Sequence, residues 1–231
     1  RFMDSSSNAF AATVSGTPSV QAFQPFPGAT TWSASVLGGS GYFDGTTDYL
    51  TVANNAALQF GTGDFTIEGW YYCTTANTTV QTLFSVGRYD SGVFLRIGTH
   101  TSGDSFYING TFWNWAPTTY FLSNLWNHLA VVRTGTTVSI FINGARVFTT
   151  TSSANITQTT ATTICGATHD LTQYFFYGYL NGFRLIKGSG PYDATSTTLT
   201  VPTAPLTAIT NTSLLCNFTN AGIFDTATMN D

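Results

Sequence analysis

Apolar and polar residues alternate with a period of two along most of the chain, and the other apolar stretches are short and rich in β-branched and aromatic residues. Period two places successive side chains on opposite faces of a strand. No useful window repeats apolar residues at positions i, i+3, i+4 and i+7, as an amphipathic helix would. We therefore expect an all-β protein of about a dozen strands with little or no helix. The expected strands span residues 41–44, 48–53, 64–73, 80–86, 93–97, 105–108, 126–133, 137–142, 145–149, 174–187 and 213–218.

Two Asn-Gly pairs predict tight hairpins. Asn143-Gly144 separates two apolar strands, and Asn109-Gly110 separates a strand from another aromatic stretch. Both central residues of a type I′ turn need positive φ, which Asn and Gly adopt most readily. Each pair is therefore expected to join two antiparallel neighbours.

Two further features concern how the strands are arranged. Gly178 and Gly182 interrupt the long apolar strand near the C-terminus and predict a bend in it. About a dozen strands in one chain predict two packed sheets. Residues 191–212, rich in Thr, Pro and Ala, have turn chemistry and are expected to cross the sandwich as a long return connection.

The composition excludes some partners. Only 8% of the residues are charged, the net charge is −4, and Lys187 is the single lysine. No basic stripe is present to neutralise phosphates, so we expect no nucleic-acid partner. No apolar run approaches the roughly 20 residues of a membrane span, so we expect no membrane insertion.

The two ends of the chain carry a similar motif. Residues 2–7 read Phe-Met-Asp-Ser-Ser-Ser, and residues 223–228 read Ile-Phe-Asp-Thr-Ala-Thr. Because Asp4 and Asp225 lie about one domain length apart, we expect one period of a repeating array followed by the start of the next. In such an array, residues 2–4 would continue the last strand of a preceding module.

Five further motifs carry a family resemblance. They are Phe43-Asp44-Gly45-x-x-Asp48-Tyr49-Leu50, Asp64-Phe65-Thr66-Ile67-Glu68-Gly69-Trp70, Trp126-Asn127-His128-Leu129-Ala130-Val131-Val132-Arg133, Val138 to Arg146, and Gly178-Tyr179-Leu180-Asn181-Gly182-Phe183-Arg184-Leu185. In this order they resemble the laminin-G-like, concanavalin A-like jelly rolls. The resemblance implies a two-sheet antiparallel jelly-roll sandwich over residues 36–219. Residues 1–35 would form a lead-in strand and linker, and residues 220–231 the start of a connection to a following module.

The C-terminal part resembles a narrower branch of that family. The segment Val201-Pro202-x-x-Pro205-Leu206 and the strand after it look like modules found in tandem in tail-fibre and other virion structural proteins of bacteriophages, especially marine and cyanobacterial ones. This resemblance implies a place on the virion surface or another extracellular place. Its implied partners are neighbouring modules of the same chain and other virion proteins.

The resemblance also implies a candidate calcium site. Members of the broad fold often bind Ca²⁺ at loops that join the sheets, and the matching places here hold Asp90 and Asp170. Calcium takes six to eight oxygen ligands, so two aspartates with neighbouring carbonyls would make a weak site. The alternative is that both aspartates accept hydrogen bonds within their own turns.

Aromatic residues next to polar groups are candidates for glycan binding, because sugars stack on flat rings while amides and hydroxyls bond their hydroxyl groups. Residues 107–120 include Phe112, and a second group surrounds the two candidate loops. The expected ligand-binding residues are Tyr89, Trp113, Trp115, Tyr120, His169, Gln173 and Tyr174. Trp113 and Trp115 would alternatively fill the sandwich edge or contact a neighbouring module.

The expected function is a non-enzymatic structural and adhesion module of a phage appendage, a tail or capsid fibre, that binds host-surface glycans. A free secreted lectin is one alternative. A glycosidase is another, but such enzymes use paired carboxylates, and Glu68 is the only glutamate and has no acidic neighbour along its strand. His128, two residues after Trp126, is expected to be a partly buried histidine rather than a base.

Overall fold

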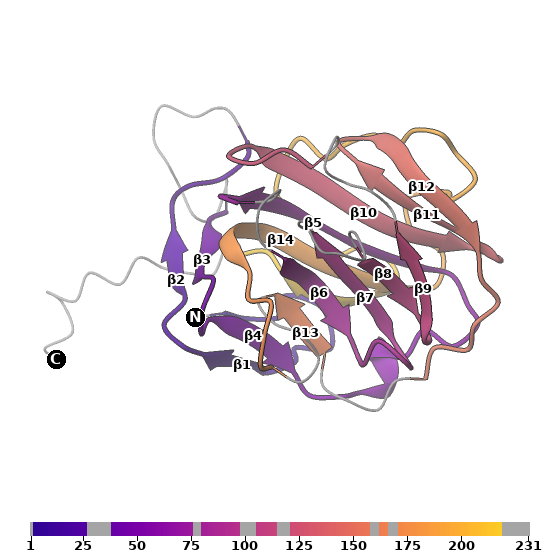
Figure 1. Ribbon diagram of the computed structural model, residues 1–231, viewed down its shortest axis with the longest axis horizontal. Coiled ribbons are helices and arrows are strands. Elements are labelled where there is room, and N and C mark those ends of the chain that lie inside the picture. The colour runs from indigo at the N-terminus through magenta and orange to yellow at the C-terminus, as the bar shows by residue number, and fades with distance from the viewer. Residues whose placement is uncertain are drawn as a thin grey trace, which may run out of the picture.

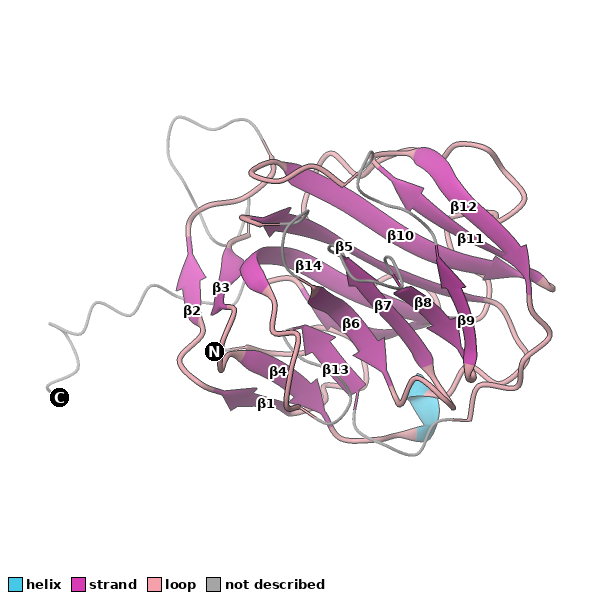
Figure 2. Ribbon diagram, viewed as in Figure 1, coloured by secondary structure: helices cyan, strands magenta, loops and turns pink. Residues whose placement is uncertain are grey.

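Two antiparallel sheets packed face to face make up the fold (Figures 1 and 2). The computed structural model describes residues 2–26, 38–75, 80–97, 105–114, 121–157, 162–165 and 171–218. Within these ranges the helical structure is limited to one 3₁₀ turn, η1 (Ala56–Leu58). The predicted all-β jelly-roll sandwich is confirmed.

The first sheet has seven strands, with β1 and β9 at its edges. Along the chain its strands are interleaved with those of the second sheet, as expected of a jelly roll. In spatial order they are β1 (Ala12–Ser15), β4 (Tyr49–Val52), β13 (Thr162–Cys165), β6 (Gln81–Val86), β7 (Val93–Ile97), β8 (Ser105–Ile108) and β9 (Thr111–Asn114).

The second sheet has eight strands and holds the long strands of the molecule. Its order is β12 (Ala145–Thr151), β11 (Thr137–Ile142), β10 (Trp126–Thr134), β5 (Phe65–Cys73), β14 (Tyr177–Lys187), β3 (Ser40–Asp44) and β2 (Ser19–Gln21), with β15 (Thr212–Cys216) also paired to β14. β3 pairs with the first half of β14 and β15 with the second half, so these two short strands follow each other along one side of it.

The inward-facing side chains of the strands fill the space between the sheets. On β5, Phe65, Ile67 and Tyr71 are buried in this core. Phe84 of β6 meets Phe183 of β14 with ring centroids 6.2 Å apart. Burying an apolar side chain of this size stabilises the fold by about 1.5–3 kcal/mol. The period-two pattern therefore determines which face of each strand is interior.

Both predicted hairpins are confirmed. Asn143 and Gly144 join β11 to β12 with φ of 49° and 87°, and Asn109 and Gly110 join β8 to β9 with φ of 46° and 83°. Positive φ at both central positions is the type I′ requirement that the Asn-Gly pairs indicated. The bend expected in the long strand is also present, as a register shift in β14 at Gly182.

The N-terminal segment closes onto its own domain. Asp4 Oδ1 accepts a hydrogen bond from the Leu215 backbone N–H at 2.8 Å, and the Ser5 N–H donates to the Leu215 carbonyl at 2.6 Å. The ring of Phe2 packs edge-on against Phe218. In this structure β15 of the same chain supplies these partner groups, and the continuation of a preceding module's last strand by residues 2–4 stays a prediction.

The return connection crosses the outer face of the eight-stranded sheet, as predicted. Ala194 is buried against Ala130, Val132 and Phe141, and Tyr192 and Leu199 pack against the same cluster. Serine and backbone groups reinforce the contact, since Ser139 Oγ donates to the Ala194 carbonyl at 2.7 Å. An outer sheet face that would otherwise be in water is thereby partly covered.

The bounds of three short strands were not predicted, although a lead-in strand was expected within residues 1–35. β1, β2 and β13 are only three or four residues long, and segments this short carry too little alternation to be recognised.

No helix in the described part of the chain is long and apolar enough to cross a membrane.

Candidate functional site

Three aromatic side chains line up across neighbouring strands on the outer face of the seven-stranded sheet. Phe94 of β7 is paired with Tyr107 of β8, and Tyr107 is paired with Phe112 of β9. Their ring centroids are 5.8 Å and 5.2 Å apart. Phe94 is buried, whereas Phe112 on the edge strand is 41% exposed. The rings therefore become accessible toward the edge of the sheet.

Arg96 is held among these rings. Its guanidinium carbon lies 5.5 Å from the ring centroid of Phe94, 5.8 Å from that of Tyr107 and 5.0 Å from that of Tyr174. A cation over an aromatic face is attracted by the ring quadrupole, by about 0.5–2 kcal/mol. The three contacts fix the position of this positive charge.

Tyr174 reaches the site from the segment that precedes β14. The Thr82 backbone N–H donates to the Tyr174 carbonyl at 2.8 Å, and the Tyr177 N–H donates to the buried Gln81 side chain at 2.7 Å. Tyr174 has a φ of 55°, which is uncommon for a residue other than glycine. The strained backbone is held by these bonds and brings the ring over Arg96.

Tyr89 comes from the loop between β6 and β7. The Gly110 N–H donates to the Tyr89 carbonyl at 2.8 Å, and the Asn109 N–H donates to the Gly92 carbonyl at 2.9 Å. These bonds place the loop against the β8–β9 hairpin, where the Tyr89 ring lies 5.8 Å from that of Tyr107. Tyr89 is 40% exposed.

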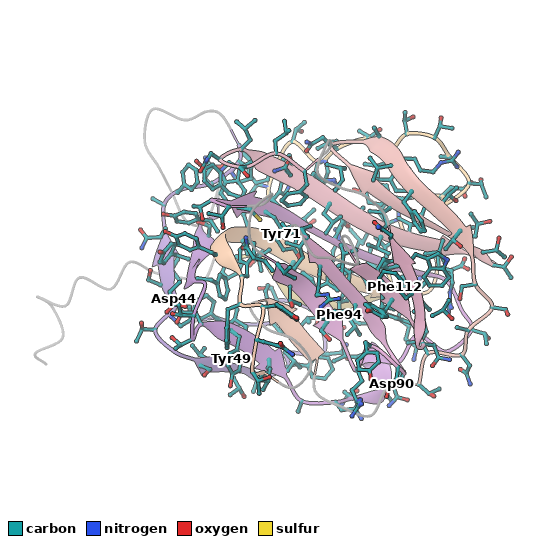
Figure 3. All side chains as sticks on the ribbon, in the orientation of Figure 1. Asp44, Tyr49, Tyr71, Asp90, Phe94 and Phe112 are labelled. Carbon is teal, nitrogen blue, oxygen red and sulfur yellow. The ribbon has the colours of Figure 1, made fainter. Side chains whose placement is uncertain are left out.

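We refer to these side chains together as the arginine–aromatic surface. It consists of Tyr89, Phe94, Arg96, Tyr107, Phe112 and Tyr174. Figure 3 labels Phe94 and Phe112, which belong to this surface, and Asp90 in the neighbouring loop.

Polar groups border the arginine–aromatic surface. Arg88 Nε donates to Asp90 Oδ1 at 3.1 Å, and both side chains are exposed. The Arg88 guanidinium also lies 5.6 Å from the Tyr89 ring centroid. Gln173, next to Tyr174, is exposed. Hydrogen-bonding groups beside accessible rings are the combination that carbohydrate recognition requires.

The structure places some of the predicted residues together. Tyr89 and Tyr174 belong to the arginine–aromatic surface, and Asp90 and Gln173 are their neighbours in sequence. Four other predicted residues lie outside the described part of the chain: Trp115, Tyr120, His169 and Asp170.

Trp113 does not belong to the arginine–aromatic surface. It alternates with Phe112 on β9, so the two side chains point to opposite faces. Its ring lies 5.9 Å from that of the buried Phe106, and it packs against the core. For Trp113, the alternative of filling the sandwich edge is the one that the structure shows.

Four members of the surface, Phe94, Arg96, Tyr107 and Phe112, are not among the binding residues that the sequence predicts. A usable signal was present in β7, where Arg96 is the one charged residue in an apolar strand. An arginine in this strand must occupy the outer face, and Phe94, two positions before it, lies on the same face. The residues paired with Phe94 on the neighbouring strand cannot be deduced without the register.

The described residues do not by themselves form a calcium site. Asp90 Oδ1 is already engaged by Arg88 and by the Ser91 hydroxyl. No group of three or more His, Cys, Asp or Glu side chains that could hold a metal gathers within the described ranges. Because Ca²⁺ needs six to eight oxygen donors, the site expected at Asp90 and Asp170 remains a proposal.

Glu68 is buried in an ion network on the other sheet. Its Oε1 accepts hydrogen bonds from Arg184 Nε at 2.9 Å and Nη2 at 2.5 Å. Its Oε2 lies 3.2 Å from His128 Nε2 and accepts from the Tyr192 hydroxyl at 3.0 Å. His128, expected to be partly buried, is fully buried.

The ion network does not suit glycosidase chemistry. Burial raises the pKa of Glu68, but the hydrogen bond from His128 and the charge of Arg184 outweigh burial and hold that pKa below its usual range. A general acid needs a raised pKa, and either catalytic role needs contact with substrate. Glu68 is closed off from solvent and its oxygens are occupied, so it fits neither the acid nor the nucleophile.

Solved structures share this fold at low sequence identity. A Bacteroides ovatus protein, provisionally described as carbohydrate-binding, has a TM-score of 0.52 at 18% identity, covering 65% of this chain and 44% of its own. Domain 4 of the arabinanase AbnA from Geobacillus stearothermophilus, solved with arabinotriose, has a TM-score of 0.50 at 15% identity, covering 75% of this chain and 83% of its own. Botulinum neurotoxin type C, whose cell entry depends on two ganglioside molecules, has a TM-score of 0.52 at 11% identity, covering 83% of this chain and 46% of its own.

These likenesses concern the fold. This chain spans less than half of the Bacteroides and neurotoxin chains. No curated protein matches the sequence. Residues 44–189, however, match the family described as the concanavalin A-like lectin/glucanases superfamily. That stretch is more than half of the chain and includes Phe94, Arg96, Tyr107 and Phe112. The chain belongs to the concanavalin A-like lectin/glucanases superfamily.

Proposed function

We propose that this chain is a non-catalytic carbohydrate-binding adhesion module and that the arginine–aromatic surface is its binding site. The observation that carries the proposal is the cross-strand row Phe94–Tyr107–Phe112, which is open at the sheet edge and bordered by polar side chains. Two structurally similar proteins support the ligand class: the AbnA domain was solved in complex with arabinotriose, and cell entry of the neurotoxin depends on interaction with two ganglioside molecules. The buried and ion-paired state of Glu68 supports a role without catalysis.

The chemistry of the surface suggests how a sugar is held. The apolar face of a pyranose or furanose ring would stack on Phe112 and Tyr89, the two most exposed rings. Its hydroxyl groups would bond to Arg88, Asp90 and Gln173, which present both donors and acceptors. Arg96 would act mainly by fixing the rings, since its guanidinium is enclosed by them.

A glycan array tests the proposal. The array is probed with the wild-type chain and with Phe112→Ala, which is expected to lose at least about tenfold in affinity because a stacking face is removed. Ile209→Ala is the matched control, since Ile209 is a similarly exposed apolar residue on the return connection of the other sheet. Unchanged binding by Phe112→Ala would rule out this surface as the binding site.

The same array, run with EDTA, tests the calcium proposal. Binding that is lost with EDTA and restored by added Ca²⁺ would support metal ligation by Asp90 and Asp170. Replacement of either aspartate by asparagine is then expected to reproduce the loss. Binding that is indifferent to EDTA would exclude a required metal.

We further propose that the module is part of a virion appendage and contacts neighbouring modules and other virion proteins. The similar motifs around Asp4 and Asp225, together with the resemblance to phage modules, support this proposal. Antibody labelling of intact particles is expected to mark a surface fibre. Sedimentation of the natural protein as a small free oligomer would instead favour a secreted lectin.

A further inference from the structure

A second row of aromatic side chains crosses the eight-stranded sheet. Tyr42 of β3 is paired with Tyr179 of β14, Tyr179 with Tyr72 of β5, and Tyr72 with Trp126 of β10. We call these four residues the aromatic row. Neighbouring strands lie about 4.8 Å apart, so the aromatic row extends about 14 Å across the sheet.

The aromatic row lies on the outer face of the sandwich. Tyr42 and Tyr72 alternate with Phe43 and Tyr71, which belong to the core between the sheets. Each side chain of the aromatic row is half-buried. Consecutive ring centroids are 5.1 Å, 5.9 Å and 5.7 Å apart, which is the spacing of interacting aromatic pairs. The aromatic row is therefore continuous.

Phe23, from the segment that follows β2, occupies the centre of the aromatic row. Its ring centroid lies 4.8 Å from that of Tyr72, 4.9 Å from that of Tyr179 and 5.2 Å from that of Trp126. Phe23 is nevertheless 42% exposed. Its backbone is attached by the Ser40 hydroxyl, which donates to the Phe23 carbonyl at 2.5 Å. The backbone of Phe23 is thus held in place while its ring remains partly open to solvent.

Two features indicate that the aromatic row is built for a ligand. Trp126 Nε1 is buried and has no hydrogen-bond acceptor among the described residues, which is costly for an indole N–H. At the other end, Tyr177 packs against Tyr42 with ring centroids 6.4 Å apart and is 37% exposed, which extends the aromatic surface. An accessible apolar patch of this kind, rimmed by hydroxyl groups, is typical of a binding site rather than of ordinary surface.

The chemistry of the aromatic row selects the class of ligand. Its four side chains are uncharged and carry three phenol hydroxyls and one indole N–H, so they offer ring faces and neutral hydrogen bonds. A linear, uncharged oligosaccharide has the same alternation of apolar ring faces and hydroxyls, and its ring oxygens or hydroxyls could accept from Trp126 Nε1. An anionic glycan would find no counter-charge among these four residues.

We propose that the aromatic row is a second carbohydrate site, for a linear uncharged oligosaccharide, and that Phe23 occupies this site until the ligand displaces it. The inference rests on the proposed function only for the chemical class of the ligand, since the two surfaces lie on different sheets. Phe23 acts as an intramolecular competitor. Removing its ring therefore strengthens binding, whereas removing a ring of the aromatic row weakens it.

The test titrates neutral cellohexaose, xylohexaose and arabinohexaose into the full chain and its variants by isothermal calorimetry. Phe23→Ala is expected to bind at least one of these probes about tenfold more tightly than the wild type, because the ligand no longer has to displace the Phe23 ring from its aromatic contacts. Trp126→Leu and Tyr179→Leu, each made in the Phe23→Ala background, are expected to abolish the gain. Two row variants are used so that a folding failure of one leaves the other informative, with circular dichroism to check folding.

The outcomes separate this inference from the proposed function. Loss of array binding in Phe112→Ala with no effect of Phe23→Ala on any hexasaccharide would overturn the aromatic-row site and leave the proposed function intact. Tighter hexasaccharide binding by Phe23→Ala, unaffected by Phe112→Ala, would support the aromatic row even if the arginine–aromatic surface bound nothing. Weaker binding by Phe23→Ala would show that Phe23 is a ligand contact and would refute its role as competitor.

Discussion

Replacing Glu68 with glutamine tests the buried ion network under the return connection. The carboxylate bonds Arg184, His128 and Tyr192, and both Glu68 and Arg184 are buried. Glutamine keeps nearly the same shape but removes the negative charge. The Arg184 guanidinium then remains in the interior without its counter-ion.

The expected loss follows from that unpaired charge. Breaking a buried ion pair by removing one partner typically costs about 3–5 kcal/mol. Arg184 Nη1 also donates to the Thr207 carbonyl at 2.6 Å, and this bond is retained in the variant. We therefore expect a loss of about 3 kcal/mol in the free energy of unfolding. With a urea dependence of about 2 kcal/mol per molar, the midpoint falls by about 1.5 M.

Urea unfolding at pH 7, followed by circular dichroism and tryptophan fluorescence, measures this loss. Tyr192→Phe is the matched control, because it removes one hydroxyl bond to the carboxylate and is expected to cost about 1.5 kcal/mol. Combining Glu68→Gln with Arg184→Met removes both charges and is expected to restore part of the stability. A loss below about 1 kcal/mol in Glu68→Gln would refute the reasoning and show that the network contributes as little as a surface ion pair.

Three further predictions concern stability. Folding lowers the pKa of Glu68, so the stabilisation by its carboxylate is present above the unfolded pKa and is lost as the pH falls below about 4. The urea midpoints at pH 7 and pH 3 should therefore differ less in Glu68→Gln than in the wild type. Gly144→Ala should lower the melting temperature more than Gly135→Ala, because both have positive φ but an added Cβ meets a carbonyl oxygen at 2.9 Å only at Gly144; equal shifts would contradict this. Asp4→Ala should destabilise the fold by about 2 kcal/mol in urea unfolding, because its carboxylate accepts bonds from three backbone N–H groups, and no change would mean that the N-terminal segment is not part of the domain.

The local features of this protein could be predicted from its sequence. The alternation in β5 and β10 identifies their core-facing residues, and the Asn-Gly pairs at residues 109–110 and 143–144 identify two hairpins. These signals are readable because they depend on backbone preferences and side-chain periodicity within a few residues. The return connection was predictable for the same reason, since its composition favours turns.

The candidate sites were predicted only in part. Tyr89 and Tyr174 could be selected as aromatic residues in loops, but nothing near either residue in the sequence indicates that Arg96 and Tyr107 gather them on one surface. Trp113 was selected for its ring, although its strand position turns it toward the core. A side chain's face is local information, whereas its neighbours across the sheet depend on the register.

The sequence by itself determined the all-β class, most of the strands and the period-two pattern that gives each strand a core-facing side. Only the tertiary structure decided which distant side chains meet. Glu68 acquires Arg184 as its counter-ion, and Tyr42 and Trp126 become ends of one aromatic row, through strand pairings between remote segments. The reason is physical: alternation is encoded residue by residue, but the order and register of the strands come from the packing of the whole sandwich.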